Sequence, residues 1–403
     1  MNKTVTPGYL HGELRVLPSK SASHRAVMMA ALARGKTLLE PMQLSKDIGA
    51  TLACAQALGL TCGAAMAAGE TEGFVRAEIW GGGEAEKRPL RELDCGESGS
   101  TLRFFIPLAL DGRGPVRLIG HGRLMQRPLT VYQNLFAPLG VVWRQEGDAL
   151  TVEGELKSGR FELPGDVSSQ FISGLLLALP LLAADSTLCV LPPVESRPYI
   201  DITLDVMRSF GVQVDEWDEN CFFIPGQQHY AARVAAVEGD WSNAAFLLAL
   251  GEGVTVTGLR AESLQGDRVC RDMLRRLQSP GAQLDLTACP DLGPVLFAAA
   301  ARAHGAVFTG TRRLRIKESD RVAAMAQELA KLGVRVDAEE NRVTVHPGGI
   351  AAPREVLDGH NDHRIVMALS VLATSVGGTI RGAEAVAKSY PDFFEVLQAL
   401  GIR

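Results

Sequence analysis

The sequence predicts a mixed α/β fold with two similar domains, and three observations support this prediction. Helices that stop at a glycine and lead into a short alternating strand recur through the 403 residues. Helices that open with a small or polar turn and are apolar on every side alternate with them. Short β-like runs such as LRVLP, VRLIG and GVTVTG lie between the helices. The repeated unit therefore contains two helices and several strands, and we count six copies.

The first series of helices is recognised by its ends. A glycine directly after a helix fits the left-handed conformation of a helix C-cap. The stops are AQALGLTC (55–62), FAPLGVVW (136–143), MRSFGVQV (207–214), LQSPGAQL (277–284), AKLGVRV (330–336) and LQALGIR (397–403). These stops are too far apart for a solenoid, which favours compact domains instead.

The second series of helices predicts the cores. Its members are PSKSASHRAVMMAALA (18–33), CGESGSTLRFFIPLAL (95–110), PGDVSSQFISGLLLALP (164–180), EGDWSNAAFLLALG (238–251), CPDLGPVLFAAAA (289–301) and GHNDHRIVMALSVLA (359–373). A helix that is apolar all round must be buried on every side. Three such helices, wrapped by sheets and outer helices, would make one domain. Six copies make two domains, with the midpoint near 237–239.

The composition argues against several functional classes. Only 6% of residues are aromatic and the net charge is −5, which disfavours nucleic-acid binding. The longest apolar run, at 175–184, is interrupted by Pro180 and is too short for a bilayer. The N-terminus lacks the features of a signal peptide. The seven cysteines form no CxxC pair and no zinc-type cluster, as a reduced compartment permits. We expect a cytoplasmic protein without a metal site.

Cations stand at the starts of the apolar helices, where the helix dipole disfavours them. Lys20 and Arg25 are the first example. Free N–H groups at a helix start already attract anions. Added lysine and arginine suit phosphate or carboxylate groups brought by a substrate. The eight cations of this kind are Lys20, Arg25, Arg103, Arg127, Lys317, Arg321, Arg364 and Lys388. We expect them to repel one another without a ligand, which favours an open state that closes on binding.

Each of these residues alone also has a purely structural interpretation. A single cation is commonly a surface group or half of an ion pair. Ser168 and Ser169 could cap their helix, and Asp291 could do the same. His363 could be an ordinary buried histidine. Recurrence at equivalent places of the repeats favours a shared site.

Eight segments, in order, carry a resemblance to a known family. They are PSKSASHR (18–25), GESGSTLR (96–103), QRPL (126–129), GDVSSQF (165–171), SRPYIDITLDVM (196–207), RIKESDR (315–321), NDHRIVMA (361–368) and KSYPDFF (388–394). With them the chain resembles, from end to end, the 5-enolpyruvylshikimate-3-phosphate (EPSP) synthase family, also called 3-phosphoshikimate 1-carboxyvinyltransferases. The resemblance implies the enolpyruvyl transferase fold, an inside-out α/β barrel. In that fold each of two domains has three βαβαββ repeats around buried parallel helices.

The resemblance also implies domain limits and a reaction. One domain would span 19–237 and mainly bind shikimate 3-phosphate. The other would combine 1–18 with 238–403 and mainly bind phosphoenolpyruvate, with a two-stranded hinge near 18 and 238. The family moves the enolpyruvyl group of phosphoenolpyruvate to the 5-hydroxyl of shikimate 3-phosphate and releases phosphate. The reaction proceeds by addition and elimination through a tetrahedral intermediate, without metal or organic cofactor. A monomer in the shikimate pathway of aromatic amino-acid and chorismate biosynthesis is implied.

Residue roles follow from the same resemblance. Lys20, Asp291 and Glu318 would be catalytic: Asp291 and Lys20 act on the 5-hydroxyl, and Glu318 exchanges a proton with the methylene carbon. Shikimate 3-phosphate would contact Lys20, Ser21, Arg25, Ser168, Ser169, Gln170, Ser196, Tyr199, Asp291 and Lys317. Phosphoenolpyruvate would contact Lys20, Gly99, Arg103, Arg127, Gln170, Arg321, Arg364 and Lys388.

The sequence departs from the common family pattern at Glu97, Ser98, Phe104 and Arg313. Three other functions compete. A UDP-N-acetylglucosamine 1-carboxyvinyltransferase would carry an asparagine after the first lysine, where Ser21 stands, and a cysteine in the loop that reads GHGRLMQRP. A non-enzymatic anion-binding repeat protein would have no use for Asp291 and Glu318. An RNA-end-processing enzyme is disfavoured by the charge and the few aromatics.

Overall fold

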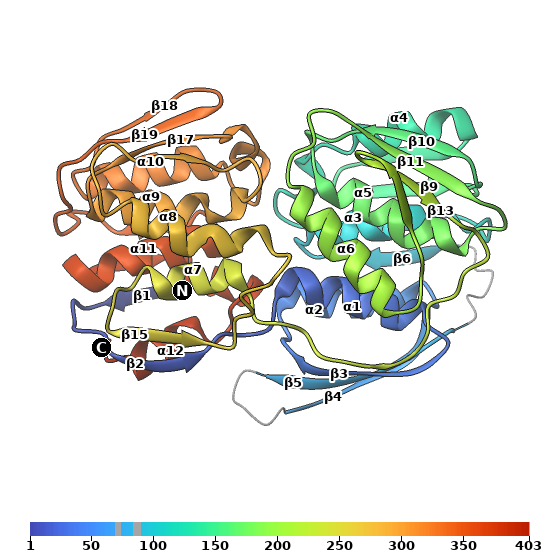
Figure 1. Cartoon of the computed structure of the whole chain (residues 1–403), viewed down its shortest axis with the longest axis horizontal. Coiled ribbons are helices and arrows are strands. Elements are labelled where there is room, and N and C mark those ends of the chain that lie inside the picture. The colour runs from blue at the N-terminus through green and yellow to red at the C-terminus, as the bar shows by residue number, and fades with distance from the viewer. Residues whose placement is uncertain (69–73, 84–89, 403) are drawn as a thin grey trace. The chain divides into compact units, whose positions relative to one another are not determined.

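The chain folds into two compact units (Figure 1). The computed structural model describes residues 1–68, 74–83 and 90–402. Unit 1 comprises Met1–Ser19 and Glu238–Arg403, and unit 2 comprises Lys20–Val237. The chain passes between the units twice, and the two connections are bonded to each other. Ser19 N donates to Glu238 O over 2.7 Å, and Pro18 forms an antiparallel bridge with Gly239.

Unit 2 contains the repeated unit in its plainest form. One copy is β6 (Arg91–Asp94), α3 (Gly99–Ala109), β7 (Val116–Ile119), α4 (Thr130–Phe136), β8 (Val142–Glu146) and β9 (Ala149–Glu153). Its sheet has the order β6-β7-β9-β8, in which β6 and β7 are parallel and the other neighbours antiparallel. The parallel pair requires a crossover, which α3 supplies, and the antiparallel pair is closed by a short turn.

Two further copies have the same order of elements and the same strand pairing. The first, in unit 2, is β10 (Arg160–Pro164), α5 (Ser169–Ala178), β11 (Ser186–Leu191), α6 (Arg197–Ser209), β12 (Asp215–Asp218) and β13 (Cys221–Ile224). The second, in unit 1, is β16 (Gln283–Asp285), α9 (Gly293–Arg302), β17 (Ala306–Thr309), α10 (Arg321–Lys331), β18 (Val336–Ala338) and β19 (Arg342–Val345). The periodicity of the sequence therefore reflects a repeated βαβαββ fold.

The remaining sheets draw strands from distant parts of the chain. In unit 2, β14 (Val234–Ala235) completes the sheet of β3 (Gly35–Met42), β5 (Val75–Gly81) and β4 (Thr61–Ala68), next to α1 (Lys20–Leu32) and α2 (Lys46–Ala57). In unit 1, β2 (Gly12–Arg15) pairs with β15 (Val254–Thr257), and β21 (Gly378–Arg381) lies between β1 (Asn2–Val5) and β20 (Leu357–Asp358). The other helices of unit 1 are α7 (Trp241–Leu248), α8 (Cys270–Arg276), α11 (His363–Val376) and α12 (Phe393–Ala399). The mixed α/β prediction is confirmed, as separate open sheets of two to four strands.

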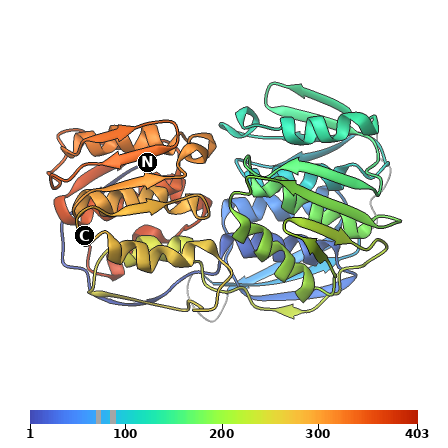
Figure 2. The ribbon, with the colours of Figure 1, turned by 45° about the horizontal axis from the view of Figure 1, so that its top comes forward.

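The apolar helices form the cores, as predicted. In α5, every residue from Phe171 to Ala178 is buried, and in α11 every residue from His363 to Thr374. Within each unit the sheets lie outside these helices (Figure 2). The six glycine stops all adopt positive φ, between 72° at Gly140 and 108° at Gly401. The C-cap prediction is therefore confirmed, because a side chain at these positions would strain the backbone.

One cysteine pair differs from the expectation of reduced thiols. Cys189 on β11 and Cys221 on β13 are direct register partners, and a disulfide joins them. Opposed residues on antiparallel strands have Cβ atoms close enough for this bond. The spacing of cysteines along the sequence could not show it, because the pairing depends on strand register. Among the described side chains, Cys54, Cys95, Cys270 and Cys289 are free thiols and buried.

Candidate active site

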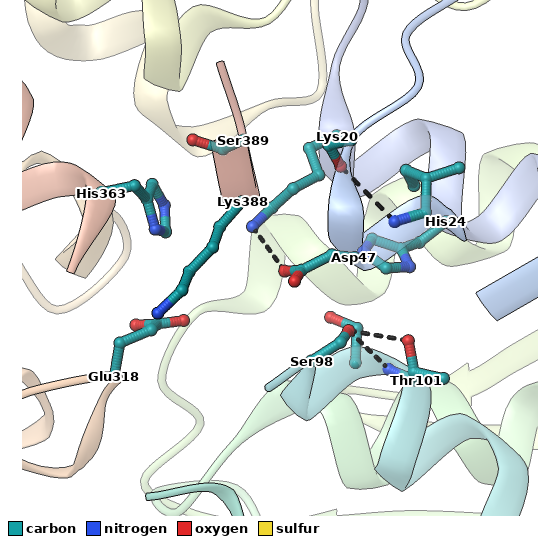
Figure 3. Close-up of polar contacts among 12 residues, drawn as sticks. Lys20, His24, Asp47, Ser98, Thr101, Glu318, His363, Lys388 and Ser389 are labelled. Carbon is teal, nitrogen blue, oxygen red and sulfur yellow. Dashed lines mark hydrogen bonds and ion pairs between the residues drawn. The ribbon is translucent and has the colours of Figure 1, made fainter. Parts of the chain in front are cut away.

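In unit 2, the first residue of α1 forms an ion pair that the sequence analysis did not find. Lys20 Nζ donates to Asp47 Oδ2 over 3.1 Å (Figure 3), and the two side chains are only 16% and 12% exposed. Asp47 lies in the first turn of α2, behind the N-cap Ser45. The carboxylate therefore compensates the cation that stands unfavourably at the start of α1. An acidic first turn is common in helices, so no local pattern distinguishes Asp47 as the partner of Lys20.

Arg25 connects α1 with α5 and α6 by hydrogen bonds. Its Nε donates to Thr203 Oγ1 over 2.6 Å, and its Nη2 donates to Ser173 Oγ over 3.1 Å and to the carbonyl of Tyr199 over 2.9 Å. Its Nη1 donates to the carbonyl of Ser21 over 2.8 Å. Burial lowers the pKa of Arg25 to about 10. Arg25 therefore contacts two other predicted residues directly, through the backbone carbonyls of Ser21 and Tyr199.

A second cluster gathers at the starts of α3 and α5. Arg103 Nη1 donates to Gln170 Oε1 over 2.6 Å, and Gln170 Nε2 donates to Ser100 Oγ over 2.9 Å. Gly99 makes this possible, because a Cβ there would lie 2.8 Å from the Nη1 atoms of both Arg103 and Arg127. The structure thus brings three predicted residues, Arg103, Arg127 and Gln170, together around Gly99, and a larger residue at this position would displace the two arginines.

The predicted serines of unit 2 occupy helix starts. Ser168 is the N-cap of α5, where its Oγ accepts from Gln170 N over 3.3 Å, as the structural alternative expected. Ser169 follows and is buried. Ser196 precedes α6 with φ 58° and ψ 38°, a left-handed conformation that is uncommon for a residue with a side chain. Such strain clusters at functional sites, so Ser196 stays a candidate.

A buried chain of hydroxyl groups fixes these helix starts to one another. His24 Nδ1 lies 2.9 Å from Thr51 Oγ1, which lies 2.8 Å from Thr101 Oγ1. Thr101 Oγ1 donates to Ser98 Oγ over 2.7 Å, and Ser98 caps α3 (Figure 3). Burial lowers the pKa of His24 well below its ordinary value, so the ring is neutral and serves as a structural link. This series of hydrogen bonds connects α1, α2 and α3 beside Lys20.

In unit 1, Asp291 is contacted by three cations. Its Oδ1 accepts from Arg321 Nη1 over 2.9 Å and lies 3.3 Å from Lys317 Nζ, and its Oδ2 accepts from Arg364 Nη2 over 3.1 Å. Asp291 lies in the short helix Pro290–Leu292 that leads into α9, and the N-cap position of α9 is the next residue, Leu292. Burial is the main reason that the pKa of Lys317 is lowered.

Arg321 is the centre of this network. Its side chain is 1% exposed, and it donates to Asp362 Oδ2 over 2.9 Å and to Glu318 Oε2 over 2.7 Å in addition to Asp291. Burial alone would lower the pKa of Arg321, but the attraction of the three carboxylates exceeds that effect and raises it. Arg321 therefore stays charged at any ordinary pH and holds both proposed catalytic carboxylates of this unit.

Arg364 and Lys388 complete the cation set of unit 1. Arg364 Nη1 donates to Ser242 Oγ over 2.7 Å and to the carbonyl of Asp291 over 3.2 Å. Lys388 Nζ donates to the carbonyl oxygen of Asn361 over 2.6 Å and to its Oδ1 over 3.0 Å. Both side chains are buried, and Figure 3 shows Lys388 extending toward Glu318. Sequence reasoning assigned no role to Ser242 or Asn361, because nothing local links them to a cation more than twenty residues away.

The expected repulsion among cations is wrong for unit 1. Lys317, Arg321 and Arg364 are compensated by Asp291, Glu318 and Asp362, which lie within salt-bridge distance. Asp362 also caps α11 by accepting from Arg364 N over 2.9 Å. Opposite charges at 3 Å attract more strongly than like charges separated by an intervening carboxylate repel. An anionic substrate would therefore compete with these carboxylates for the cations.

The described residues contain no group of three or more His, Cys, Asp or Glu that could hold a metal ion. In the same parts of the chain, no helix is long and apolar enough to cross a membrane. The network of unit 1 itself combines carboxylates and a lysine, which can transfer protons, with arginines, which can bind anions.

Six α/β repeats with polar, charged starts to their buried helices define an α/β protein of the enolpyruvyl transferase fold. Comparison with known proteins supports this class and narrows it. The family model described as EPSP synthase (3-phosphoshikimate 1-carboxyvinyltransferase) matches residues 5–397. The chain therefore belongs to the EPSP synthase family.

Individual relatives can be aligned with this chain over nearly the whole length of both sequences. The chain is 38% identical to the 3-phosphoshikimate 1-carboxyvinyltransferase of Clostridium kluyveri, covering 99% of this chain and 97% of that protein. It is 37% identical to the protein of the same name from Clostridium acetobutylicum, covering 98% and 96%. Among solved structures, EPSP synthase from Acinetobacter baumannii matches with a TM-score of 0.77 and 25% identity, covering 100% of this chain and 99% of the other. The enolpyruvyl transferase NikO from Streptomyces tendae shares the fold, with a TM-score of 0.75 and 17% identity over 100% and 97% of the two chains.

Proposed function

We propose that this chain is a 3-phosphoshikimate 1-carboxyvinyltransferase (EC 2.5.1.19) of the shikimate pathway. It transfers the enolpyruvyl group of phosphoenolpyruvate to the 5-hydroxyl of shikimate 3-phosphate and releases phosphate. The observation that carries the proposal is the network of unit 1, in which Asp291 and Glu318 share the buried cation Arg321. Two carboxylates held by one guanidinium supply proton-transfer groups inside an anion-binding environment. In a protein that only bound anions, these carboxylates would compete with the anion for the same cations.

Unit 2 is proposed to bind mainly shikimate 3-phosphate. The residues proposed for it are Lys20, Ser21, Arg25, Ser168, Ser169, Gln170, Ser196 and Tyr199, with Asp291 and Lys317 from unit 1. The polar starts of α1, α5 and α6 supply N–H groups and hydroxyls that suit a phosphate and a carboxylate. Arg25 already makes four hydrogen bonds inside the unit. We therefore propose that Arg25 both holds Ser21 and Tyr199 in place and adds positive charge to this part of the site.

Unit 1 is proposed to bind mainly phosphoenolpyruvate. Arg321, Arg364 and Lys388 would hold its phosphate and carboxylate, with Lys20, Gly99, Arg103, Arg127 and Gln170 from unit 2. Arginines suit these groups because their forked N–H donors match two oxygens at once. Arg321 and Arg364 are each oriented by an ion pair with a carboxylate before any substrate binds. Such preorganisation lowers the cost of ordering side chains on binding.

The reaction is proposed to proceed by addition and elimination through a tetrahedral intermediate. Asp291, assisted by Lys20, takes the proton of the 5-hydroxyl as the oxygen attacks C2 of phosphoenolpyruvate. Glu318 delivers a proton to the methylene carbon in the addition and removes one in the elimination, when phosphate leaves. Arginine and lysine stabilise the departing phosphate. The mechanism uses no metal or organic cofactor, and a cytoplasmic monomer is part of the proposal.

The decisive experiment measures phosphate release from the purified protein with phosphoenolpyruvate and each of two acceptors. We expect release with shikimate 3-phosphate and none with UDP-N-acetylglucosamine. Release only with the sugar nucleotide would instead identify the chain as a UDP-N-acetylglucosamine 1-carboxyvinyltransferase. No release with either acceptor, in protein that is folded by circular dichroism, would refute the catalytic roles of Asp291 and Glu318.

A further inference from the structure

The loop between β20 and α11 holds two strained residues in succession. His360 has φ 49° and Asn361 has φ 51°, both in the left-handed region, and neither is glycine. A left-handed residue with a side chain costs about 1–2 kcal/mol, and such strain persists only where the surroundings impose it. The loop directly precedes Asp362, the N-cap of α11. The contacts that hold it are therefore of interest.

Glu328 on α10 contacts this loop through its buried carboxylate. Its side chain is 0% exposed, and its Oε2 accepts from the backbone N–H of Asp358 over 2.8 Å. Its Oε1 lies 3.0 Å from His360 Nε2. The same carboxylate accepts from Lys331 Nζ over 2.8 and 3.0 Å. A buried carboxylate is costly unless every oxygen is bonded, and here the bonds go to the loop and to one lysine.

The loop in turn orients residues of the proposed phosphoenolpyruvate set. Both the carbonyl and the side-chain oxygen of Asn361 accept from Lys388 Nζ. The next residue, Asp362, accepts from Arg321 Nε and from the backbone N–H of Arg364. With this left-handed backbone, Asn361 presents both of its oxygens to one lysine. A change in the loop would therefore move both of the Asn361 oxygens that accept from Lys388.

We propose that Glu328 is a positioning residue for the phosphoenolpyruvate half of the site. It acts through His360 and the backbone of Asp358 to hold the loop that aims Lys388. The inference rests on the proposed function, because that proposal is what gives Lys388 its substrate. Glu328 touches no reacting atom, so its effect should appear in the binding of one substrate and leave the other unchanged.

The test compares two variants that act on the same buried carboxylate. Glu328→Gln removes the charge that holds the loop, whereas Lys331→Met removes the other partner and keeps the bonds to Asp358 and His360. Both should lower the melting temperature. Only Glu328→Gln should raise the KM for phosphoenolpyruvate. The expected rise is about tenfold, because losing one charge-assisted hydrogen bond weakens binding by about that factor. The KM for shikimate 3-phosphate should stay within about twofold in both.

A third variant covers the case in which Glu328→Gln does not fold. His360→Gly keeps a left-handed backbone available and removes only the ring that contacts Glu328. It should raise the KM for phosphoenolpyruvate by a smaller factor. An equal rise of both KM values, or a lower melting temperature with unchanged KM in Glu328→Gln and His360→Gly, would overturn the inference.

Calorimetric titration with phosphoenolpyruvate, with and without shikimate 3-phosphate, separates this inference from the proposed function. Weaker binding by Glu328→Gln, in a protein whose wild type releases no phosphate, would reject the reaction and retain the positioning role. Normal turnover by the wild type with unchanged phosphoenolpyruvate binding by Glu328→Gln would retain the reaction and reject the positioning role.

Discussion

Replacement of Arg321 by glutamine should destabilise unit 1 strongly, and the structure indicates by how much. The arginine is buried and donates to Asp291, Glu318 and Asp362. Glutamine is shorter and neutral, so it would leave three carboxylates close together with Lys317 and Arg364 as the remaining described cations. Removal of one partner from a buried ion pair costs about 3–5 kcal/mol, because the other charge stays desolvated. We expect a loss in this range in the free energy of unfolding at pH 8.

The pH dependence of this loss gives a second check. At pH 8 the three carboxylates of the variant are ionised and repel one another. Lowering the pH to 5 allows one of them to take up a proton, which relieves the repulsion. In the wild type Arg321 keeps its charge at both values, because the carboxylates raise its pKa. The difference between variant and wild type should therefore be smaller at pH 5 than at pH 8.

Urea unfolding, read by pulsed hydrogen exchange on peptides from each unit, measures the effect where it arises. Arg91→Gln is the matched control, because Arg91 in unit 2 is also buried but pairs with one carboxylate, Asp111, at 2.6 Å. Its loss should be about 1–3 kcal/mol and confined to unit 2. A loss below about 1 kcal/mol for Arg321→Gln, or one that does not depend on pH, would refute the reasoning on buried charge.

Three further predictions concern single residues. Glu318→Gln should bind both substrates with nearly unchanged affinity and lose at least about a hundredfold in turnover, measured by single-turnover kinetics, since only proton transfer is removed; equal turnover would remove Glu318 from the mechanism. Burial is the main cause that raises the pKa of Asp267 to about 6. Between about pH 4 and pH 6 the folded state therefore holds a proton that the unfolded state releases, and the free energy of unfolding falls as the pH rises through this range. Asp267→Asn should therefore stabilise the protein by about 1–3 kcal/mol more at pH 7.5 than at pH 4 in urea titrations, and the reverse order would contradict the assignment. Gly174→Ala should destabilise unit 2 by about 1–3 kcal/mol in the same assay, because the new Cβ would lie 2.4 Å from both Tyr132 Oη and Arg103 O; a neutral effect would mean that α3 and α5 can separate freely.

Some features of this protein follow from local sequence alone. The stretch Phe171–Ala178 is apolar on every side, and it is buried on every side. The glycine stops adopt the left-handed conformation expected of helix C-caps. The polar turns before the apolar helices do carry the caps Ser98, Ser168 and Asp362. These features are set by residues within one or two turns of each other, so a single sequence contains them.

The charge balance of the candidate site was decided by the tertiary structure. The sequence showed the cations Lys20 and Arg321 but not that Asp47 and Asp362 lie against them. Pairs of this kind join residues that are 27 and 41 positions apart. They exist because several helices begin at the same end of a unit, and helical periodicity does not fix which starts become neighbours. The expected repulsion failed for this reason.

The same distinction holds for the strands and the strained loop. That β1 and β2 complete sheets with β21 and β15 depends on a pairing across most of the chain. His360, the first of the two left-handed residues His360 and Asn361, contacts the buried carboxylate of Glu328, thirty-two positions before it. Local propensity determines which segments become helix or strand, because it acts through short-range hydrogen bonding and burial. Which charges meet is determined by packing, because only the folded core brings distant side chains within the few ångströms over which they act.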